Sequence, residues 1–303
     1  MASSITKDNL SKGLLYAGST ALLWGFLAIL LKIALNYVNA ITLAWFRFAI
    51  AFVILTTILA IRDRKKLNLL KKPPKRAFLA GIALGFNYVG FITGIDHTTA
   101  SNAQIFIQTG PLLLALSGIV IFKEKLSAIQ LTGFLIALGG FAVFFNEQLG
   151  SLISEDQSAY ITGSLMVIGA AISWACYAAL QKSLVTTHNP QSLNIILFAV
   201  PGFMLLPFID YTVFTQLSFG MWLVVIFLGL NTVLAYGALA EAFQYIEANK
   251  VAIVITLNPI ITIITMSVFA YMEVEFIEPD VISLIGVLGA LLVITGAILA
   301  VKR

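Results

Sequence analysis

The chain has 303 residues, of which 60% are hydrophobic and 11% are charged. Soluble domains average about 25% charged residues, so this composition, with a mean hydropathy of +0.99, excludes an ordinary soluble protein. A net charge of +4 would favour a nucleic-acid partner in a soluble basic protein. Here the basic residues gather between apolar stretches, so we expect a lipid bilayer as partner and no nucleic acid.

Apolar stretches of membrane-spanning length follow one another along the whole chain. A helix needs about 20 apolar residues to cross a bilayer. Such stretches lie at about 13–35, 40–61, 76–96, 101–122, 127–145, 160–182, 190–209, 217–240, 248–272 and 281–301. We therefore predict an all-α, polytopic integral membrane protein with ten transmembrane helices.

The basic residues predict on which side of the membrane each loop lies. If the densely basic loop at 62–76 is cytoplasmic, the alternation of ten helices places every Lys and Arg except Lys32 and Arg47 at the cytoplasmic side. The opposite loops carry acidic residues instead. Cytoplasmic loops are enriched in Lys and Arg, so we expect a multi-pass protein of the cell's inner (plasma) membrane with both termini in the cytoplasm.

The chain also repeats itself, at an offset of 150 residues early in the sequence and 148 later. The matched pairs are Gly13 with Gly163, Trp24 with Trp174, Lys32 with Lys182, Gly81 with Gly229, Tyr88 with Tyr236 and Pro111 with Pro259. Because five helices precede the second copy, the two copies enter the membrane from opposite sides, which is how many transporters are built. We predict two inverted five-helix repeats at 1–145 and 160–303, joined by an external acidic linker at 146–159.

Two pairs of glycines lie four residues apart in the stretch at 76–96. They are Gly81 with Gly85 and Gly90 with Gly94. Small residues at this spacing let helices approach closely in lipid, and the two pairs point to roughly opposite helix faces. We therefore expect this helix to be packed on both sides.

Matched aromatic residues lie at mid-depth in the predicted helices. Trp24 and Trp174 sit near helix centres, although Trp normally prefers the membrane–water interface. They indicate either a polar centre or the packing of a large ring. Tyr88 and Tyr236 form a second pair, and Tyr177 lies one turn from Trp174. Together these rings are candidates for the walls of a small-molecule pocket.

A polar stripe runs along the stretch at 101–122. Ser101, Gln104 and Gln108 share one helical face. Uncharged amides inside a bilayer are costly unless they are paired or line a cavity. Hydrogen bonds between helices and a path for water or substrate are therefore both open interpretations.

A proline follows the stripe and has a match in the second repeat. Pro111 and Pro259 each lie near the middle of a predicted helix. Proline removes a backbone hydrogen bond, so we expect the carbonyls of Ile107 and Ile255 to be free. Interrupted helices at corresponding positions point to a transport site, although a kink that serves packing alone stays open.

Four ionisable residues in or next to the predicted helices stand out. Arg47 lies two turns inside, where an unpaired charge is expensive; it either pairs with a backbone carbonyl or snorkels outward, and a structural role is favoured. Glu241 either binds a cation or proton or is an interfacial carboxylate near Lys250. Both are candidates for coupling. Lys32 and Lys182 are expected to snorkel from opposite ends of matched helices.

Sequence motifs of known catalytic mechanism are missing. Neither His97 nor His188 starts an HExxH motif, a single Cys excludes CxxC, and no GxSxG, GxxxxGK[ST] or GxGxxG occurs. These patterns would mark metal, nucleophile or nucleotide chemistry. We therefore expect no enzyme, no metal and no cofactor.

The duplicated five-helix unit, the matched Trp24 and Trp174, and the Gly110–Pro111 and Asn258–Pro259 segments resemble the EamA family of the drug/metabolite transporter superfamily. The resemblance covers nearly the whole chain. In that family the proline helix continues through a Gly-Glu turn; here Lys123–Glu124 and Met272–Glu273 stand at that turn, so its glycine is absent from both copies. Arg47 matches an arginine often seen in the family's second helix.

The resemblance implies a central cavity and secondary transport of a small organic metabolite, commonly the export of an amino acid. The cavity would be lined mainly by the helices at 13–35, 76–96, 101–122, 160–182, 217–240 and 248–272. We expect aromatic walls from Trp24, Tyr88, Trp174, Tyr177 and Tyr236 and hydrogen bonds from Asn87, Gln104, Gln108 and Asn258. Pro111 and Pro259 would mark where the helices bend as access alternates.

Two other functions stay open. One is a flippase for a lipid or a lipid-linked intermediate, and the other is a non-transporting receptor or assembly subunit. The sequence also leaves open a coupling proton and whether the protein is a monomer or a homodimer.

Overall fold

The computed structural model describes residues 7–124, 127–151, 157–272 and 284–301, and every regular element within these ranges is a helix. The predicted all-α class is therefore confirmed. The helices of the first half are α1 (Lys7–Leu35), α2 (Ala40–Arg62), η1 (Arg64–Lys71), α3 (Lys75–His97), α4 (Ala100–Phe106), α5 (Thr109–Val120) and α6 (Ala128–Ser151). Those of the second half are α7 (Gln157–Leu184), α8 (Pro190–Leu205), η2 (Leu206–Phe208), α9 (Val213–Gln216), α10 (Phe219–Tyr245), α11 (Ala248–Ile255), α12 (Asn258–Tyr271) and α13 (Leu284–Val301).

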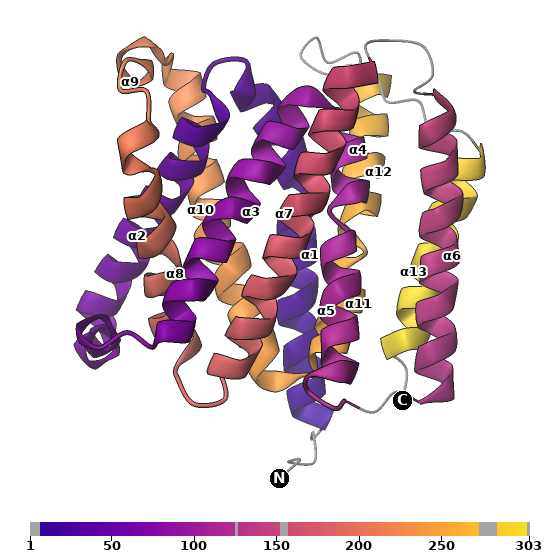
Figure 1. The fold of residues 1–303 in the computed structure, drawn as a ribbon, viewed down its shortest axis with the longest axis horizontal. Coiled ribbons are helices and arrows are strands. Elements are labelled where there is room, and N and C mark those ends of the chain that lie inside the picture. The colour runs from indigo at the N-terminus through magenta and orange to yellow at the C-terminus, as the bar shows by residue number, and fades with distance from the viewer. Residues whose placement is uncertain (1–6, 125–126, 152–156, 273–283, 302–303) are drawn as a thin grey trace.

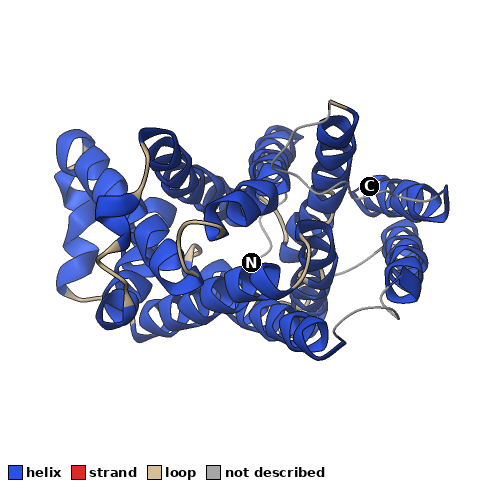
Figure 2. Ribbon diagram, turned by 90° about the horizontal axis from the view of Figure 1, so that it is seen from above, coloured by secondary structure: helices blue, strands red, loops and turns tan. Residues whose placement is uncertain are grey.

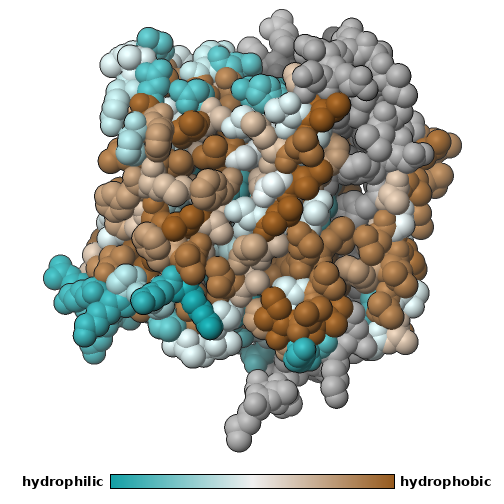
Figure 3. Space-filling model, in the orientation of Figure 1, coloured by the Kyte–Doolittle hydropathy of each residue, from teal (hydrophilic) through white to brown (hydrophobic). Residues whose placement is uncertain are grey.

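Seven helices of the described residues are long and apolar enough to cross a membrane, with α11 and α12 taken together as one of them. Shorter apolar helices lie at Thr109–Val120, Ala128–Gly140 and Leu284–Val293. The surface agrees with a protein embedded in lipid, because a broad apolar belt separates hydrophilic residues at the two ends of the molecule (Figure 3). The predicted number of ten crossings stays a prediction.

The described start of α1 and end of α13 lie at the same end of the bundle as η1 (Figure 1). Helices α6 and α7 extend into the predicted linker, up to Ser151 and from Gln157, because their helical hydrogen bonding continues beyond the apolar stretches. Residues 152–156, with two of the linker's acidic side chains, lie outside the described residues, as do Glu273 and the acidic segment that follows it.

Helices α6 and α13 pack on each other at one edge of the bundle (Figures 1 and 2). Glycines permit this approach. A Cβ atom on Gly140 would lie 2.7 Å from the carbonyl oxygen of Gly289, and one on Gly296 would lie 2.4 Å from the backbone nitrogen of Ala137. Both distances are shorter than a carbon atom tolerates, so a larger residue at either site would separate the two helices.

The first helix of each half packs against the third helix of the other half. Helix α1 lies along α10, and a Cβ on Gly13 would meet Ile246 at 2.4 Å. Helix α7 lies along α3, and a Cβ on Gly163 would meet His97 and Thr98 at 2.8 Å. The matched glycines therefore serve matched contacts, and these contacts interlock the two halves.

Helix α3 is packed on both faces, as its glycine spacing predicts. Gly81 and Gly85 face α8, where a Cβ would meet Val200 at 2.7 Å and Met204 at 2.5 Å. Gly90 and Gly94 face α7, and an added Cβ would lie within 3.2 Å of that helix at either position. Small side chains thus hold α3 in the middle of the bundle, where its polar residues meet the other half.

The second helix of each half begins in the same way. The Asn39 side chain accepts a hydrogen bond from the backbone nitrogen of Thr42 at the start of α2. Asn189, 150 residues later, accepts from the backbone of Gln191 and Ser192 at the start of α8. Asparagine is among the best N-cap residues, and the shared cap fixes the alignment of α2 with α8.

Candidate substrate-binding site

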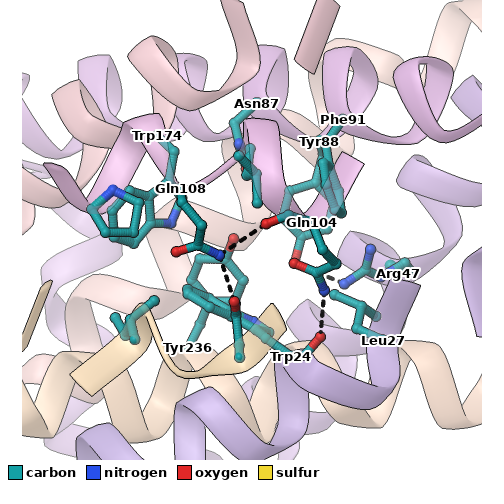
Figure 4. A pocket seen from close by; sticks show the side chains of 14 residues that line it. Trp24, Leu27, Arg47, Asn87, Tyr88, Phe91, Gln104, Gln108, Trp174 and Tyr236 are labelled. Carbon is teal, nitrogen blue, oxygen red and sulfur yellow. Dashed lines mark hydrogen bonds between the residues drawn. The ribbon is translucent and has the colours of Figure 1, made fainter. Parts of the chain in front are cut away.

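A cavity lies at the centre of the bundle, between the two halves (Figure 4). All but one of the predicted substrate residues line it: Trp24, Asn87, Tyr88, Gln104, Gln108, Trp174, Tyr236 and Asn258. Arg47 and Pro111 line it as well. Its other wall residues, none of which the sequence analysis placed in the substrate site, are Leu27, Phe91, Ile107 and Ile255.

Helical spacing is the signal that would have found three of these missed residues. Leu27, Phe91 and Ile107 each lie three residues after a predicted site residue, so they share its helix face. They are apolar residues in apolar helices, and nothing in their type separates them from the lipid-facing or packed residues nearby. Their place in the wall follows from the position of the polar residue one turn earlier.

The matched aromatic residues meet across the boundary between the halves. The ring centroids of Trp24 and Trp174 lie 5.8 Å apart at an interplanar angle of 78°. Tyr236 lies 5.3 Å from Trp24 and 5.8 Å from Tyr88. Edge-to-face contacts at these distances are favourable for aromatic rings, so the cluster is packed wall and cavity lining at once.

Tyr177 lies behind this wall and does not line the cavity. Its side chain is fully buried, its ring lies 5.7 Å from that of Tyr236, and its hydroxyl donates a hydrogen bond to Gln181. Gln181 donates to the side chain of Asn194, which in turn donates to the backbone carbonyl of Tyr236. This network fixes the position of Tyr236 from behind.

Gln104 on α4 and Gln108, in the break between α4 and α5, both form hydrogen bonds and line the cavity. The Gln104 amide donates to the carbonyl of Trp24 at 2.9 Å. The Gln108 amide donates to the carbonyl of Gln104 at 3.0 Å and to the side-chain oxygen of Asn258 at 2.5 Å (Figure 4). Asn87 donates across the halves to the carbonyl of Ala170 at 3.0 Å. Hydrogen bonding between helices, one of the two interpretations left open by the sequence, is therefore confirmed for Gln104 and Gln108. A path for water or substrate beside them stays a prediction.

Both prolines follow a break in a helix. Helix α4 ends at Phe106 and α5 begins at Thr109, while α11 ends at Ile255 and α12 begins at Asn258. The expectation that the Ile107 carbonyl is free is wrong. It accepts a hydrogen bond from the backbone nitrogen of Gly110 at 2.9 Å, because the chain tightens into a shorter turn just before the proline ring.

Arg47 is buried, with 1% of its surface exposed. It does not snorkel, because its Nε donates to the Thr232 hydroxyl at 3.2 Å and its Nη2 to the Tyr88 hydroxyl at 3.3 Å. Its guanidinium carbon lies 4.4 Å from the centroid of the Tyr88 ring. The side chain therefore joins α2, α3 and α10 at the edge of the cavity.

Glu241, the other candidate for coupling, lies away from the cavity lining. It is half-buried on α10 and accepts a hydrogen bond from the side-chain amide of Gln191 at 2.9 Å. Lys250, expected near it, forms its ion pair with Glu247 instead. A coupling role for Glu241 stays a prediction.

The matched lysines bind helix ends rather than snorkel. Lys32 on α1 donates to the carbonyls of Ile95 and Thr98 at the end of α3, at 3.1 and 3.0 Å. Lys182 on α7 donates to the carbonyls of Phe243 and Ile246 at the end of α10, at 2.8 and 2.6 Å. A cation is favourable where a helix leaves carbonyls without partners, so these sites outcompete the route to water.

Glu124, at the turn after α5, bridges the two halves. Its carboxylate accepts from the backbone nitrogens of Ala248 and Asn249 at 2.7 and 3.0 Å, in the first turn of α11. Lys123 beside it has a φ of 55°, in the left-handed region that glycine adopts at little cost. The turn therefore keeps a glycine-like backbone although the sequence supplies a lysine.

Comparison with known proteins gives a consistent result along the whole chain. The model of the EamA-like transporter family matches residues 11–146 and again residues 161–301. An uncharacterized transporter of Haemophilus influenzae is 33% identical over 292 residues, which cover 95% of this chain and 94% of that protein. The uncharacterized inner membrane transporter YhbE of Escherichia coli is 31% identical over 294 residues, 96% of this chain and 91% of its own.

A solved crystal structure has the same fold. It superposes with a TM-score of 0.71 at 18% sequence identity, and the match covers 96% of both chains. At this sequence identity, the similarity concerns only the arrangement of the helices.

Proposed function

Because the chain belongs to the EamA-like transporter family, we propose that it carries a small organic metabolite through the central cavity. The observation that carries this proposal is the composition of the cavity wall. Matched residues of both halves, such as Trp24 and Trp174, meet there beside the amides of Gln104 and Gln108. An apolar cavity with a few polar groups is typical of a small-molecule site.

We propose alternating access between the two halves as the mechanism. The helix breaks before Pro111 and Pro259 lie at corresponding positions, beside the cavity residues Gln108 and Asn258. Many transporters bind their substrate at discontinuous helices between inverted repeats, and the helices bend there. The repeats at 1–145 and 160–303 would then rock against each other around a site that neither repeat builds alone.

Transport is proposed to be secondary-active or facilitative, with export of a metabolite such as an amino acid as the direction the family favours. Empty space in and around the cavity, its opening included, is about 530 Å³. A space of this size is typical of a small-molecule site, so it favours a small metabolite over a whole lipid. The name of the relative YhbE supports an inner-membrane location.

A cytoplasmic position of both termini is part of the same proposal. The basic η1 segment lies at the end of the bundle where α1 starts and α13 ends (Figure 1). Since basic segments stay in the cytoplasm, that end would be the inner one.

The first step of the test is to find a ligand. Thermal unfolding of the purified protein is followed with amino acids, polyamines, choline, nucleosides and lipid headgroups. A ligand at 100 times its Kd stabilises the folded state by about 2.7 kcal/mol, which gives a visible shift. The compound that shifts the transition is then loaded into proteoliposomes, and its flux is measured with this protein as the only protein present.

Variants of the cavity wall decide whether the flux uses this site. Gln108→Ala and Trp174→Ala should abolish flux while the yield of folded protein is kept. Trp222→Ala is the matched control, because Trp222 packs in a separate aromatic cluster with Phe46 and Phe214. Unchanged flux in both cavity variants would remove the cavity from the mechanism. Movement of a labelled lipid, and of no soluble compound, would make the protein a flippase.

A further inference from the structure

The cavity carries a positive charge without a matching negative one. Arg47 is its charged lining residue, and the rest of the described wall is aromatic, amide or aliphatic. None of the described carboxylates lies within ion-pair distance of the Arg47 guanidinium. A charge buried in a membrane protein is costly and usually faces a partner or a functional cavity.

The immediate partners of Arg47 are neutral. Its guanidinium has five N–H donors, of which two reach the hydroxyls of Tyr88 and Thr232. The Tyr88 hydroxyl donates its own proton to Thr232, and Thr232 donates to the carbonyl of Leu228. Both hydroxyls thus accept hydrogen bonds from the guanidinium and orient it. Because they are neutral, the charge of Arg47 has no compensating negative charge within the described residues.

Three partly buried carboxylates of the described residues are engaged elsewhere. Glu124 binds the first turn of α11, Glu241 binds Gln191, and Glu247 pairs with Lys250. The compensating anion is therefore expected from outside the described part of the chain.

The second half shows that the fold does not need this cation. The shared caps Asn39 and Asn189 align α2 with α8, and this alignment places Leu197 opposite Arg47. Phe48 and its match Phe198 both pack on a tyrosine of the aromatic cluster. The second half builds the same helix pair around Tyr236 with leucine at the matched position, so a purely structural demand does not explain the arginine.

We propose that the transported metabolite carries a carboxylate, or a comparable anionic group, and that Arg47 binds it in the cavity. This inference rests on the proposed transport function. The planar guanidinium matches a carboxylate with two parallel hydrogen bonds, and the hydroxyls of Tyr88 and Thr232 hold it in a fixed orientation. The neighbouring aromatic wall would take the apolar body of the same molecule.

A second polar contact orients the ligand. The side-chain oxygen of Gln108 is buried and has no hydrogen-bond partner among the described residues. Gln108 and Arg47 lie on opposite sides of the cavity in Figure 4. An unpaired buried acceptor favours a ligand that brings a hydrogen-bond donor, so the metabolite would present its anionic group to Arg47 and a donor to Gln108.

The test compares carboxylates with their own amides on the purified full-length protein. Acetate, phenylacetate and L-leucine are each titrated beside acetamide, phenylacetamide and L-leucinamide at equal ionic strength, and thermal unfolding is followed. At least one carboxylate is expected to raise the unfolding temperature saturably, with an apparent affinity ~10-fold or more above that of its amide, as expected for a charge-assisted hydrogen bond. No preference for any carboxylate over its amide, including no binding at all, overturns the inference.

Variants assign the preference to Arg47. Arg47→Met should remove the preference, and Arg47→Lys, which keeps the charge but loses the planar fork, should weaken carboxylate binding several-fold. Arg62→Gln is the matched control, because it removes a positive charge from the exposed end of the same helix. Carboxylate binding by Arg47→Met equal to that of the wild type overturns the assignment. The wild-type comparison decides the anion preference even if Arg47→Met fails to fold.

Flux measurements separate this inference from the proposed function. If the protein transports a neutral compound, if this flux depends on Gln108 and Trp174, and if carboxylates are not preferred, the proposed role of Arg47 is overturned. The proposed transport function is then still supported. Carboxylate binding that depends on Arg47, with no flux in proteoliposomes, supports the anion site and overturns transport.

Discussion

The two halves of the molecule differ in what their matched and unmatched positions do. Several residues that the two halves share have the same structural task in both. Lys32 and Lys182 each bind the carboxyl end of the third helix of their own half, and Asn39 and Asn189 each cap a second helix. The shared residues thus build a frame that is used twice.

Most polar groups of the cavity come from the first half alone. Arg47, Asn87, Gln104 and Gln108 stand opposite Leu197, Ala235, Ala252 and Thr256 in the second half. Asn258, opposite Gly110, is the exception. The scaffold of this protein is therefore symmetric, whereas the polar chemistry of the cavity comes from positions at which the two halves carry different residues.

The largest loss of stability is expected where a shared glycine lets helices of the two halves approach each other closely. Gly163→Leu should destabilise the protein by about 2–3 kcal/mol, because its side chain would overlap His97, Thr98 and the backbone of α3. Gly13→Leu should act in the same direction, because an added Cβ would lie 2.4 Å from the Cγ2 atom of Ile246, a β-branched side chain with little freedom to move away. Unfolding of the detergent-solubilised protein by heat or SDS measures both.

Gly169→Leu is the control for this pair. It lies on α7 like Gly163, but an added Cβ would meet nothing within 4 Å. If Gly169→Leu destabilised the protein as much as Gly163→Leu, a general effect of a large side chain on α7, rather than the contact between the halves, would explain the loss.

A moderate and equal effect is expected at the matched lysines. Lys32→Met and Lys182→Met should each cost about 2 kcal/mol of stability, since each removes charged hydrogen bonds to the end of a helix. The double variant should show the sum, because distant sites without shared partners add. A loss at one lysine only would show that the frame is not used alike in both halves.

The smallest effect is expected at Lys123, in the turn after α5. Lys123→Gly should stabilise the protein by at most ~1 kcal/mol, because glycine adopts the positive φ of this residue without steric cost. The loss of backbone freedom on folding offsets part of this gain. Lys123→Ala, which keeps the cost of the conformation, should bring no such gain, and an equal gain in both variants would point to the charge of Lys123 instead.

The long helices, and the residues that are unsuited to a lipid environment, can be predicted from the sequence. Apolar length predicts the long helices, and the repeat predicts which residues correspond. Trp24, Gln104 and Gln108 stood out because aromatic and amide groups at mid-depth need partners that a bilayer does not offer. These are local properties of a residue and its helix, so they are visible without any contact.

The partners of those residues, in contrast, can be read only from the tertiary structure. Arg47 bonds to Thr232, 185 residues away, and the Lys32 ammonium reaches the end of α3 instead of water. Tyr177 shares a helix face with Trp174, yet it lies behind the cavity wall, because one face of a helix is wide enough to touch both the cavity and a neighbouring helix. Such contacts depend on how closely helices approach, and that is set by the glycines and side chains of both partners together.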